Sequence, residues 1–381
     1  MDTRAIPELQ ASGIVDLKQN VNGRTIFENN NVTILNEKES TITKINKFLH
    51  EKDHRFGGYI AHKSRASARS FVNKLEIASR TQIVHRYTID NKKVSEYLKR
   101  NIITKNLEKT AYSFSRKFKT RYYNTLGGMK ASQWIYLLWK RIGSKLDYIR
   151  VRRFKDNTPS WSPQPSVIAT IKGTSTNGEI VIVSAHIDSI NEFDGKINNS
   201  TLAPGADDNA SGTSVVTELL RVIVKTGFRP KKTIKLIGYG AEEVGLRGSQ
   251  SIVQYYSLRG KNVIGVLNLD MVGYKGSDKD LYILTDYTNP AQNQFLSNLA
   301  KEYLPNSSYG YGKCGYGCSD HVSWYYEGVP ASFIFESQAP KKPYINPHYH
   351  SKNDVKIDKN HIKTFAKISI VYLAELAKGE L

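Results

Sequence analysis

The sequence predicts an α/β fold in which a mixed central β-sheet carries helices on both faces. Two observations support this prediction. Apolar segments of strand length alternate with amphipathic helical segments through the second half of the chain, as they do in sheets with crossover helices. The segment Ile180–Ala185 is apolar almost throughout, which is typical of a strand buried on both faces.

Each further element follows from its own pattern. The segment Ser211–Thr226 has apolar residues at helical spacing, and Gly227 marks its end because glycine readily takes the left-handed conformation that closes a helix. Strands are predicted at Thr233–Tyr239, Val263–Leu269, Leu281–Leu284 and Ala331–Phe335, and helices at Ala291–Leu304 and Asp358–Lys378.

The first part of the chain has a different character, since it is polar and rich in Asn, Lys and Thr. A strand-like piece lies at Thr33–Leu35, and a helix-like piece runs from Ser67 to about Ser79. The stretch Thr81–Lys93 has little amphipathic pattern, so we interpret it as a linker. The predicted domains are a small α+β domain over residues 1–82 and a large domain over residues 83–381.

Charge and hydropathy limit the classes of partner. The 381-residue chain has a formal net charge of +20 and a pI of about 9.6. Its basic residues are scattered, and no basic helix with interleaved aromatic residues stands out, so we interpret the charge as a solvated surface and expect no nucleic-acid partner. A nucleic-acid or anionic-surface partner is the alternative that such a charge leaves open. No segment approaches the length of a membrane-spanning helix, so we expect no membrane insertion.

Two short sequences bear on the cellular compartment. The first residues, Met-Asp-Thr-Arg-Ala, lack the apolar run of a secretory signal, so either the protein is cytosolic or the sequence begins after a signal that was left out. The two cysteines, Cys314 and Cys318, are too few for a four-cysteine zinc site. Their spacing is compatible both with a short disulfide in an oxidising compartment and with two free thiols.

Acidic and imidazole side chains gather where the predicted strands end. Ligands bind beyond the carboxyl ends of the strands in sheets of this kind, so these residues are candidates for one shared site. The candidates are His186, Asp188, Asp207, Asp208, Glu242, Glu243, Asp270, His348 and His350.

Taken one at a time, these residues have ordinary explanations. A lone histidine at a strand end is commonly a hydrogen-bonded structural residue, and Asp207 or Asp208 could cap the following helix. Together they predict a metal site, because acids crowded at neutral pH repel one another unless a cation neutralises them. Mixed histidine and carboxylate ligands suit zinc. Two histidines and three carboxylates exceed one tetrahedral ion with an open position, so two ions sharing a carboxylate are expected.

From about Thr104 to the C-terminus, the sequence resembles the bacterial secreted leucyl aminopeptidases of the co-catalytic dizinc type. The resemblance covers most of the large domain and depends on the order and spacing of six motifs. These are Ser184–Asp188 (SAHID), Gly205–Asn209 (GADDN), Ala241–Ser249 (AEEVGLRGS), Leu269–Met271 (LDM), Cys314–His321 (CGYGCSDH) and Phe335–Ser337 (FES).

This resemblance implies a role for each candidate. His186 and Asp270 are expected to bind one Zn²⁺ ion, Glu243 and His350 the other, and Asp207 to bridge both. Glu242 is the expected general base and then acid. Asp188 is expected to hydrogen-bond His186 and fix its tautomer, and the Asp207–Asp208 peptide bond is expected to be cis.

The resemblance also implies a substrate pocket and a disulfide. Tyr316 is expected to face the substrate, and Cys314 is expected to pair with Cys318. The pocket for the N-terminal side chain, which we expect to be hydrophobic and leucine-like, is expected to include Met271, Cys318, Phe335 and Tyr349.

One loop departs from the family pattern. The segment between Phe335 and His350 is a few residues longer than in the leucyl enzymes and leaves His348 as a competitor for the ligand role. We favour His350, because the polar stretch Ser-Lys-Asn-Asp follows it, as a polar stretch follows the ligand in the family.

The expected protein is a secreted monomeric metalloaminopeptidase that acts on peptides and is made as a precursor, with residues 1–82 as an inhibitory propeptide. Two alternatives share the fold. A glutaminyl cyclase-like enzyme would use a single zinc ion, and a non-catalytic binding module would hold none.

Overall fold

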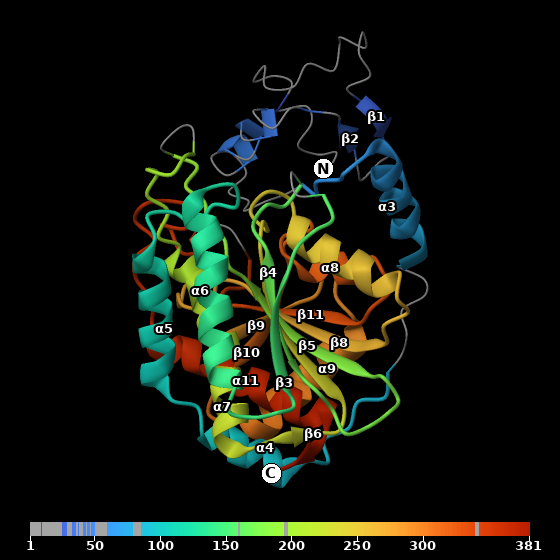
Figure 1. Ribbon diagram of the computed structural model, residues 1–381, viewed down its shortest axis with the longest axis vertical. Helices are drawn as coiled ribbons and strands as arrows, with labels where there is room; N and C mark the ends of the chain where they lie inside the picture. The colour runs from blue at the N-terminus through green and yellow to red at the C-terminus, as the bar shows by residue number, and fades with distance from the viewer. Residues whose placement is uncertain are drawn as a thin grey trace.

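A computed structural model describes Leu9, short pieces between residues 25 and 49, and residues 59–78, 85–158, 161–193, 197–339 and 343–381. Across these residues an eight-stranded sheet has the strand order β10-β9-β11-β8-β5-β7-β4-β3, with helices on both of its faces (Figure 1). The strands are β3 (Ile149–Phe154), β4 (Ser166–Ile171), β5 (Ile180–His186), β7 (Thr233–Tyr239), β8 (Val263–Leu269), β9 (Leu281–Leu284), β10 (Tyr309–Gly312) and β11 (Ala331–Phe335).

The sheet is mixed, as predicted. Strand β5 pairs in parallel with β7 and β8, β8 with β11, and β9 with β10. Antiparallel pairs join β3 to β4, β4 to β7, and β9 to β11. Because β5 lies at the centre, both of its faces are covered: Val181 and Val183 face one hydrophobic cluster, and Ile180 and Ile182 face another.

Helices form the outer layers. The larger cluster includes residues of α5 (Thr104–Lys117), α6 (Leu126–Gly143), α7 (Gly212–Thr226) and α11 (Lys359–Ala377), and the smaller one includes residues of α8 (Arg247–Ser257) and α10 (His321–Tyr325). The other helices are α3 (Arg65–Ala78), α4 (Lys92–Arg100) and α9 (Pro290–Tyr303), and the remaining short strands are β1 (Thr25–Glu28), β2 (Thr33–Leu35), β6 (Arg229–Pro230) and β12 (Gly379–Glu380). None of the described helices is long and apolar enough to cross a bilayer.

Local sequence explains where helices begin and end. The carboxylate of Asp358 accepts hydrogen bonds from the N–H groups of Asn360 and His361 and so caps α11. Gly227 takes a left-handed conformation with φ of 72° and closes α7. Both ends lie within two residues of the predicted ones.

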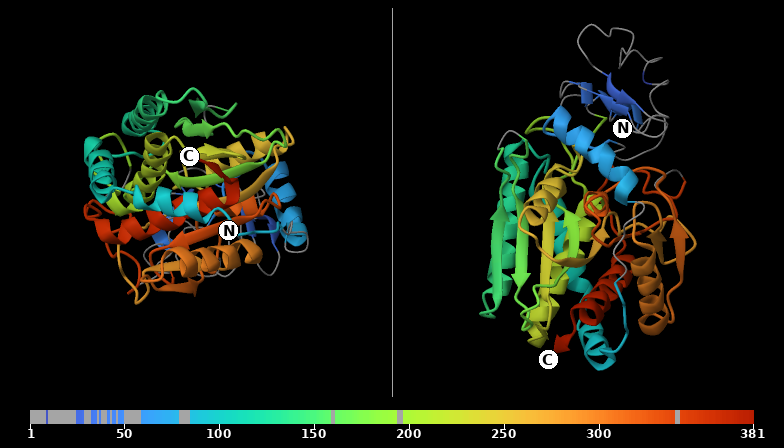
Figure 2. Two further views of the ribbon diagram at one scale, coloured as in Figure 1. Left: turned by 90° about the horizontal axis from the view of Figure 1, so that it is seen from below. Right: turned by 90° about the vertical axis from the view of Figure 1, so that its right-hand side faces the viewer.

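The described N-terminal pieces lie at one end of the sheet. Strands β1 and β2 and helix α3 sit at the end of the molecule opposite the C-terminus (Figures 1 and 2). The backbone N–H of Ala61, just before α3, donates to the carbonyl oxygen of Gly245 in the loop that follows β7, and β5 runs parallel to β7. The N-terminal pieces therefore lie over the edge of the sheet where the candidate residues were predicted to gather.

The stretch interpreted as a linker is partly packed against the large domain. Residues 81–84 lie outside the described residues. The ring of Tyr87 stacks on that of Phe295, with centroids 4.9 Å apart, and the backbone N–H groups of Asp90 and Asn91 each donate to the carboxylate of Glu375 at 2.9 Å. A free linker is therefore the wrong description from Tyr87 onward.

Candidate metal site

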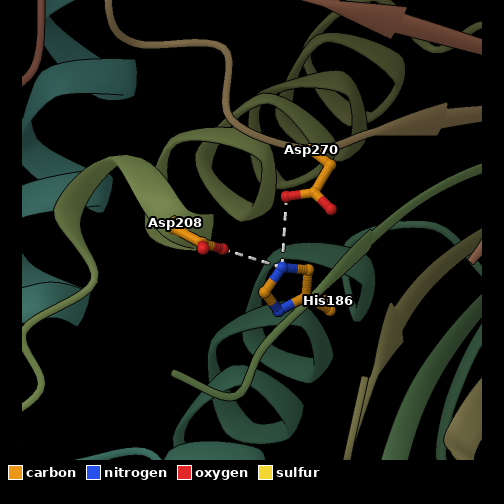
Figure 3. A group of neighbouring side chains, drawn as sticks. All are labelled: His186, Asp208 and Asp270. Carbon is orange, nitrogen blue, oxygen red and sulfur yellow. Dashed lines mark hydrogen bonds and ion pairs between the residues drawn. The ribbon is translucent and has the colours of Figure 1, made fainter. Parts of the chain in front are cut away.

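The first part of the candidate site lies at the ends of two central strands. His186 is the last residue of β5, Asp270 follows β8, and Asp208 lies in the turn before α7. The Nε2 atom of His186 is 3.0 Å from Oδ1 of Asp208 and 3.2 Å from Oδ1 of Asp270 (Figure 3). All three side chains are buried.

The second part shares Asp208 with the first. The Nε2 atom of His350 is 3.0 Å from Oδ2 of Asp208 and 2.9 Å from Oε2 of Glu243. In each of the two groups the potential ligand atoms lie within 4.8 Å of one another. The two oxygens of one buried carboxylate thus face two different histidines.

The carboxylate shared by the two groups is that of Asp208, one residue after Asp207, where the bridging ligand was expected. The carboxylate of Asp207 accepts hydrogen bonds from the N–H of Gly273 at 2.8 Å and from the amide of Asn346 at 3.0 Å. Its backbone N–H and that of Asp208 both donate to Asp354. This anchoring directs the two adjacent carboxylates to different surroundings. The cis peptide bond is likewise Asp208–Asn209, not Asp207–Asp208.

Each histidine has a further carboxylate at its other ring nitrogen. Oδ1 of Asp188 lies 3.5 Å from Nδ1 of His186, and the Asp188 carboxylate accepts the backbone N–H groups of Glu242 and Glu243 at 3.1 Å each. Asp188 therefore connects the imidazole to the loop that carries both glutamates. The resemblance implied a hydrogen bond between Asp188 and His186, and the structure places the two side chains next to each other.

The residue at the other histidine was missed by sequence reasoning. Oε2 of Glu192 lies 3.2 Å from Nδ1 of His350, and the Glu192 N–H donates to the backbone carbonyl of His350 at 3.1 Å. Glu192 lies in a loop without periodic pattern, and its sequence signal is only its position six residues after His186. A histidine that binds a metal through one ring nitrogen commonly has such a carboxylate at its other ring nitrogen.

A buried arginine, also missed by sequence reasoning, supports the loop of Asp208. The guanidinium of Arg121 donates to the carbonyl oxygens of Ile187 at 3.0 Å and Gly205 at 2.9 Å. Burial lowers the pKa of Arg121 to about 10, and the charges of Asp354 and Asp208 oppose this shift. The side chain therefore stays positive at neutral pH and offsets part of the negative charge of the site.

The environment of Glu242 favours its protonated form. It is 7 % exposed and lies on the same loop as Glu243. Burial raises the pKa of Glu242 well above its ordinary value; His186 opposes this shift, and the charges of Asp320 and Asp270 reinforce it. A carboxylate with a raised pKa is suited to take and return a proton near neutral pH.

The donor set fits zinc. Burial lowers the pKa of His186 and His350, but the neighbouring carboxylates outweigh burial and raise both pKa values well above the ordinary one. The Nε2 atom of each histidine faces two carboxylate oxygens, and a single N–H group can donate a well-directed hydrogen bond to only one of them. A divalent cation interacts with a nitrogen and both oxygens together, and zinc takes ligands of these kinds. Asp208, with one oxygen toward each group, suits a shared ligand.

The five residues expected to face or line the pocket lie together. They belong to one hydrophobic cluster with the ring of Phe333 and the side chain of Ile345; they are Met271, Tyr316, Cys318, Phe335 and Tyr349. Cys314 and Cys318 form a disulfide, as the resemblance implied. His348 is exposed and belongs to neither group, whereas His350 belongs to one of them.

Comparisons with known proteins agree with this geometry. Residues 166–373, more than half of the chain, match the sequence pattern of peptidase family M28. A probable aminopeptidase of Saccharomyces cerevisiae is 34% identical over 298 residues, which cover 76% of this chain and 74% of the relative. A probable leucine aminopeptidase of Trichophyton verrucosum is 36% identical over 271 residues, which cover 68% of each chain. The LapA aminopeptidase structure from Legionella pneumophila covers 94% of both chains with a TM-score of 0.77 and 26% identity. The chain therefore belongs to peptidase family M28.

Proposed function

We propose that the chain is a two-zinc aminopeptidase that removes a hydrophobic, leucine-like residue from the N-terminus of peptides. The observation that carries the proposal is the position of Asp208, whose two oxygens each lie 3.0 Å from a different histidine. Each histidine also has its own second carboxylate, Asp270 or Glu243. This arrangement supports two ions rather than one.

The residues of the site have separate proposed roles in metal binding and proton transfer. His186, Asp208 and Asp270 would hold one zinc ion, and Asp208, Glu243 and His350 the other. When bound, the two ions supply Lewis acidity toward a carbonyl group and lower the pKa of water. Glu242 takes a proton from the attacking water and returns it to the leaving amine. Tyr316 lies in the pocket cluster, where its hydroxyl could donate to the developing oxyanion.

The apolar cluster that contains Tyr316 supports the proposed substrate preference. Met271, Phe335 and Tyr349 are at most 2 % exposed and present aliphatic and aromatic surface. A pocket of this kind binds a leucine-like side chain by removing its apolar surface from water. The leucine aminopeptidase relative agrees with this preference.

Hydrolysis assays on the purified, zinc-loaded protein test the function. We expect leucyl p-nitroanilide to be hydrolysed faster than the aspartyl and lysyl compounds, and expect an N-acetylated leucyl compound to resist. A peptide with N-terminal glutamine is assayed in parallel, to test for cyclisation. Its cyclisation without leucyl hydrolysis would favour a glutaminyl cyclase-like enzyme, and no reaction of either kind would favour a binding module.

We also propose that residues 1–82 form an inhibitory propeptide and that the protein is secreted as a monomer. The position of β1, β2 and α3 over the carboxyl edge of the sheet supports the first proposal (Figure 2), as does an ion pair of 2.6 Å between Lys63 and Asp156. The disulfide supports secretion, because such bonds persist in oxidising compartments.

Limited proteolysis tests the propeptide. Cleavage between Ser79 and about Lys105 would release the N-terminal region. The contacts of Tyr87 with Phe295 and of Asp90 with Glu375 make the bonds before Tyr87 the preferred targets there. Trypsin cleavage at Arg80 or Arg86 should raise leucyl hydrolysis while the large fragment stays folded. Unchanged or lower activity after a clean cut would contradict an inhibitory role.

A further inference from the structure

A short segment of the N-terminal region, without regular secondary structure, is held by the large domain as a bound peptide would be. The backbone N–H of Ala61 donates to the carbonyl oxygen of Gly245 at 3.1 Å. The side-chain amide of Gln250 donates to the carbonyl oxygen of Ala61 at 3.0 Å. Both backbone polar groups of Ala61 are therefore paired with the large domain, a mode of recognition that does not depend on the side chain.

The residue before Ala61 supplies an apolar contact. Ile60 packs against a cluster that includes Leu246, Val322 and Tyr326. A Cβ atom built on Gly317 would lie only 3.6 Å from Cδ1 of Ile60, so the isoleucine side chain also covers this glycine. Without the segment, the part of the cluster beneath Ile60 would be uncovered, and exposed apolar patches commonly bind a partner.

The covered surface belongs to two loops of the candidate active site. The N–H groups of Gly245 and Leu246 donate to the carbonyl oxygen of Glu242, at 3.0 and 2.9 Å. Gly317 lies between Tyr316 and Cys318, two residues of the pocket cluster. The segment therefore sits on the loop of the proposed general base and on the loop of the proposed substrate-facing tyrosine.

Gly245 shows how closely the segment follows this surface. Its φ of 90° favours glycine, and a Cβ atom there would lie 2.6 Å from the backbone nitrogen of Ala61 and 2.8 Å from the ring of Tyr59. Any side chain at position 245 would collide with the segment. The close fit of backbone to backbone is what an extended peptide requires from its binding site.

We propose that this surface is a peptide-binding subsite for the part of the substrate that follows the scissile bond, and that residues 59–61 occupy it in place of substrate. We call it the Ile60 surface; it consists of Gly245, Leu246, Gln250, Gly317, Val322 and Tyr326. The inference rests on the proposed function. It adds a substrate class: extended peptides of several residues that place an aliphatic side chain on Leu246 and Val322 and pair their backbone with Gly245 and Gln250.

The test measures binding of a labelled peptide to the full-length chain. The probe is acetyl-Tyr-Ile-Ala-His-Lys(fluorescein)-amide, which carries the sequence of residues 59–63 and a blocked amine that an aminopeptidase cannot use. In the unaltered chain, the tethered segment competes at a high effective concentration. Ile60→Asp should release the segment, so fluorescence anisotropy should show the probe binding at least about tenfold more tightly to this variant. Leu258→Asp, at a side chain 78% exposed, is the matched control and should bind as the unaltered chain does.

Two further variants make the test specific. A probe with aspartate in place of isoleucine should bind the Ile60→Asp chain at least about tenfold more weakly, because the apolar contact is lost. Adding Gln250→Ala to that chain should weaken the isoleucine probe about fivefold, the effect of one hydrogen bond. If Ile60→Asp fails to fold, Ala61→Pro replaces it, since proline lacks the N–H that Gly245 accepts.

The outcomes separate this inference from the proposed function. Equal binding of the isoleucine probe to all chains, or equal binding of both probes, overturns the Ile60 surface even if leucyl hydrolysis is found. Selective binding without leucyl hydrolysis contradicts the aminopeptidase and leaves the peptide-binding surface standing.

Discussion

The two halves of the candidate metal site are built in different ways. The half around His186 uses the last residue of β5 and the first residue after β8, and the hydrogen bonds of the sheet hold both strands. The half around His350 uses two loops, and His350 itself has a φ of 53°, which is uncommon for a residue other than glycine. We expect the loop-built half to be the more easily disturbed, because fewer backbone hydrogen bonds fix its ligands.

The carboxylates behind the histidines differ in the same way. Asp188 accepts two backbone N–H groups of the Glu242–Glu243 loop and so joins the two halves. Glu192 contacts the ring of His350 and the carbonyl group of the same residue. Asp188 therefore supports the whole site, whereas Glu192 acts as a clamp on one loop. The variants below separate these two kinds of support.

The largest effect is expected for the residue that the halves share. Asp208→Asn should lower the affinity for both zinc ions and reduce kcat/KM on the order of a thousandfold, since it removes a charged ligand from each. Asp207→Asn is the matched control one residue earlier and should keep both ions. Metal analysis after dialysis decides the matter. If Asp208→Asn lost only one zinc ion, or if Asp207→Asn lost both, the assignment of Asp208 as the bridging ligand would be contradicted.

Glu242→Gln should leave zinc bound in both halves of the site and still remove most of the hydrolytic activity. A general base contributes a factor of about a hundred to ten thousand in rate, and glutamine keeps the shape of the side chain while losing its proton affinity. Zinc content and kcat are measured on the same sample. Near-normal turnover with two ions bound would show that Glu242 is not the base.

The two histidines of the late loop provide a test of the loop-built half alone. His350→Ala should release one zinc ion, keep the ion at His186 and lower kcat/KM about a hundredfold or more, because one half of a two-metal site is lost. His348→Ala should change neither quantity, since His348 is exposed and outside both groups. If His348→Ala lost a zinc ion and activity while His350→Ala lost neither, His348 would be the ligand.

The smallest effects should distinguish the two supporting carboxylates. Removal of a carboxylate behind a metal-ligating histidine typically costs a factor of about ten to a hundred in metal affinity or activity. Glu192→Ala should weaken one ion within this range, measured by competition with a chromophoric chelator. Asp188→Ala should weaken both, because the loop of Glu243 also depends on it. If each variant weakened the binding of only one zinc ion, and by the same factor, the proposed difference between Asp188 and Glu192 would be contradicted.

Strand ends were predictable because their patterns are regular. The apolar run before His186 indicated a buried strand, and the carboxyl end of such a strand in a parallel arrangement is a fixed place for a ligand. Asp270 follows β8 for the same reason. The helix ends at Gly227 and Asp358 were also predictable, because each has the residue type that closes or caps a helix.

Positions set by irregular backbone were not predictable. Asp207 and Asp208 are identical in chemistry, and the turn around them decides which carboxylate faces the histidines. That turn depends on Asp354 and Arg121, which lie far away in the sequence. Glu192 reaches His350 across 158 residues, and no local pattern marks such a contact.

The number of zinc ions per chain tests the central claim most directly. The purified full-length protein, loaded with zinc and dialysed against metal-free buffer, should retain two ions per chain by inductively coupled plasma mass spectrometry, and His350→Ala should retain one. One ion in the unaltered protein, or none, would contradict a two-ion centre bridged by Asp208.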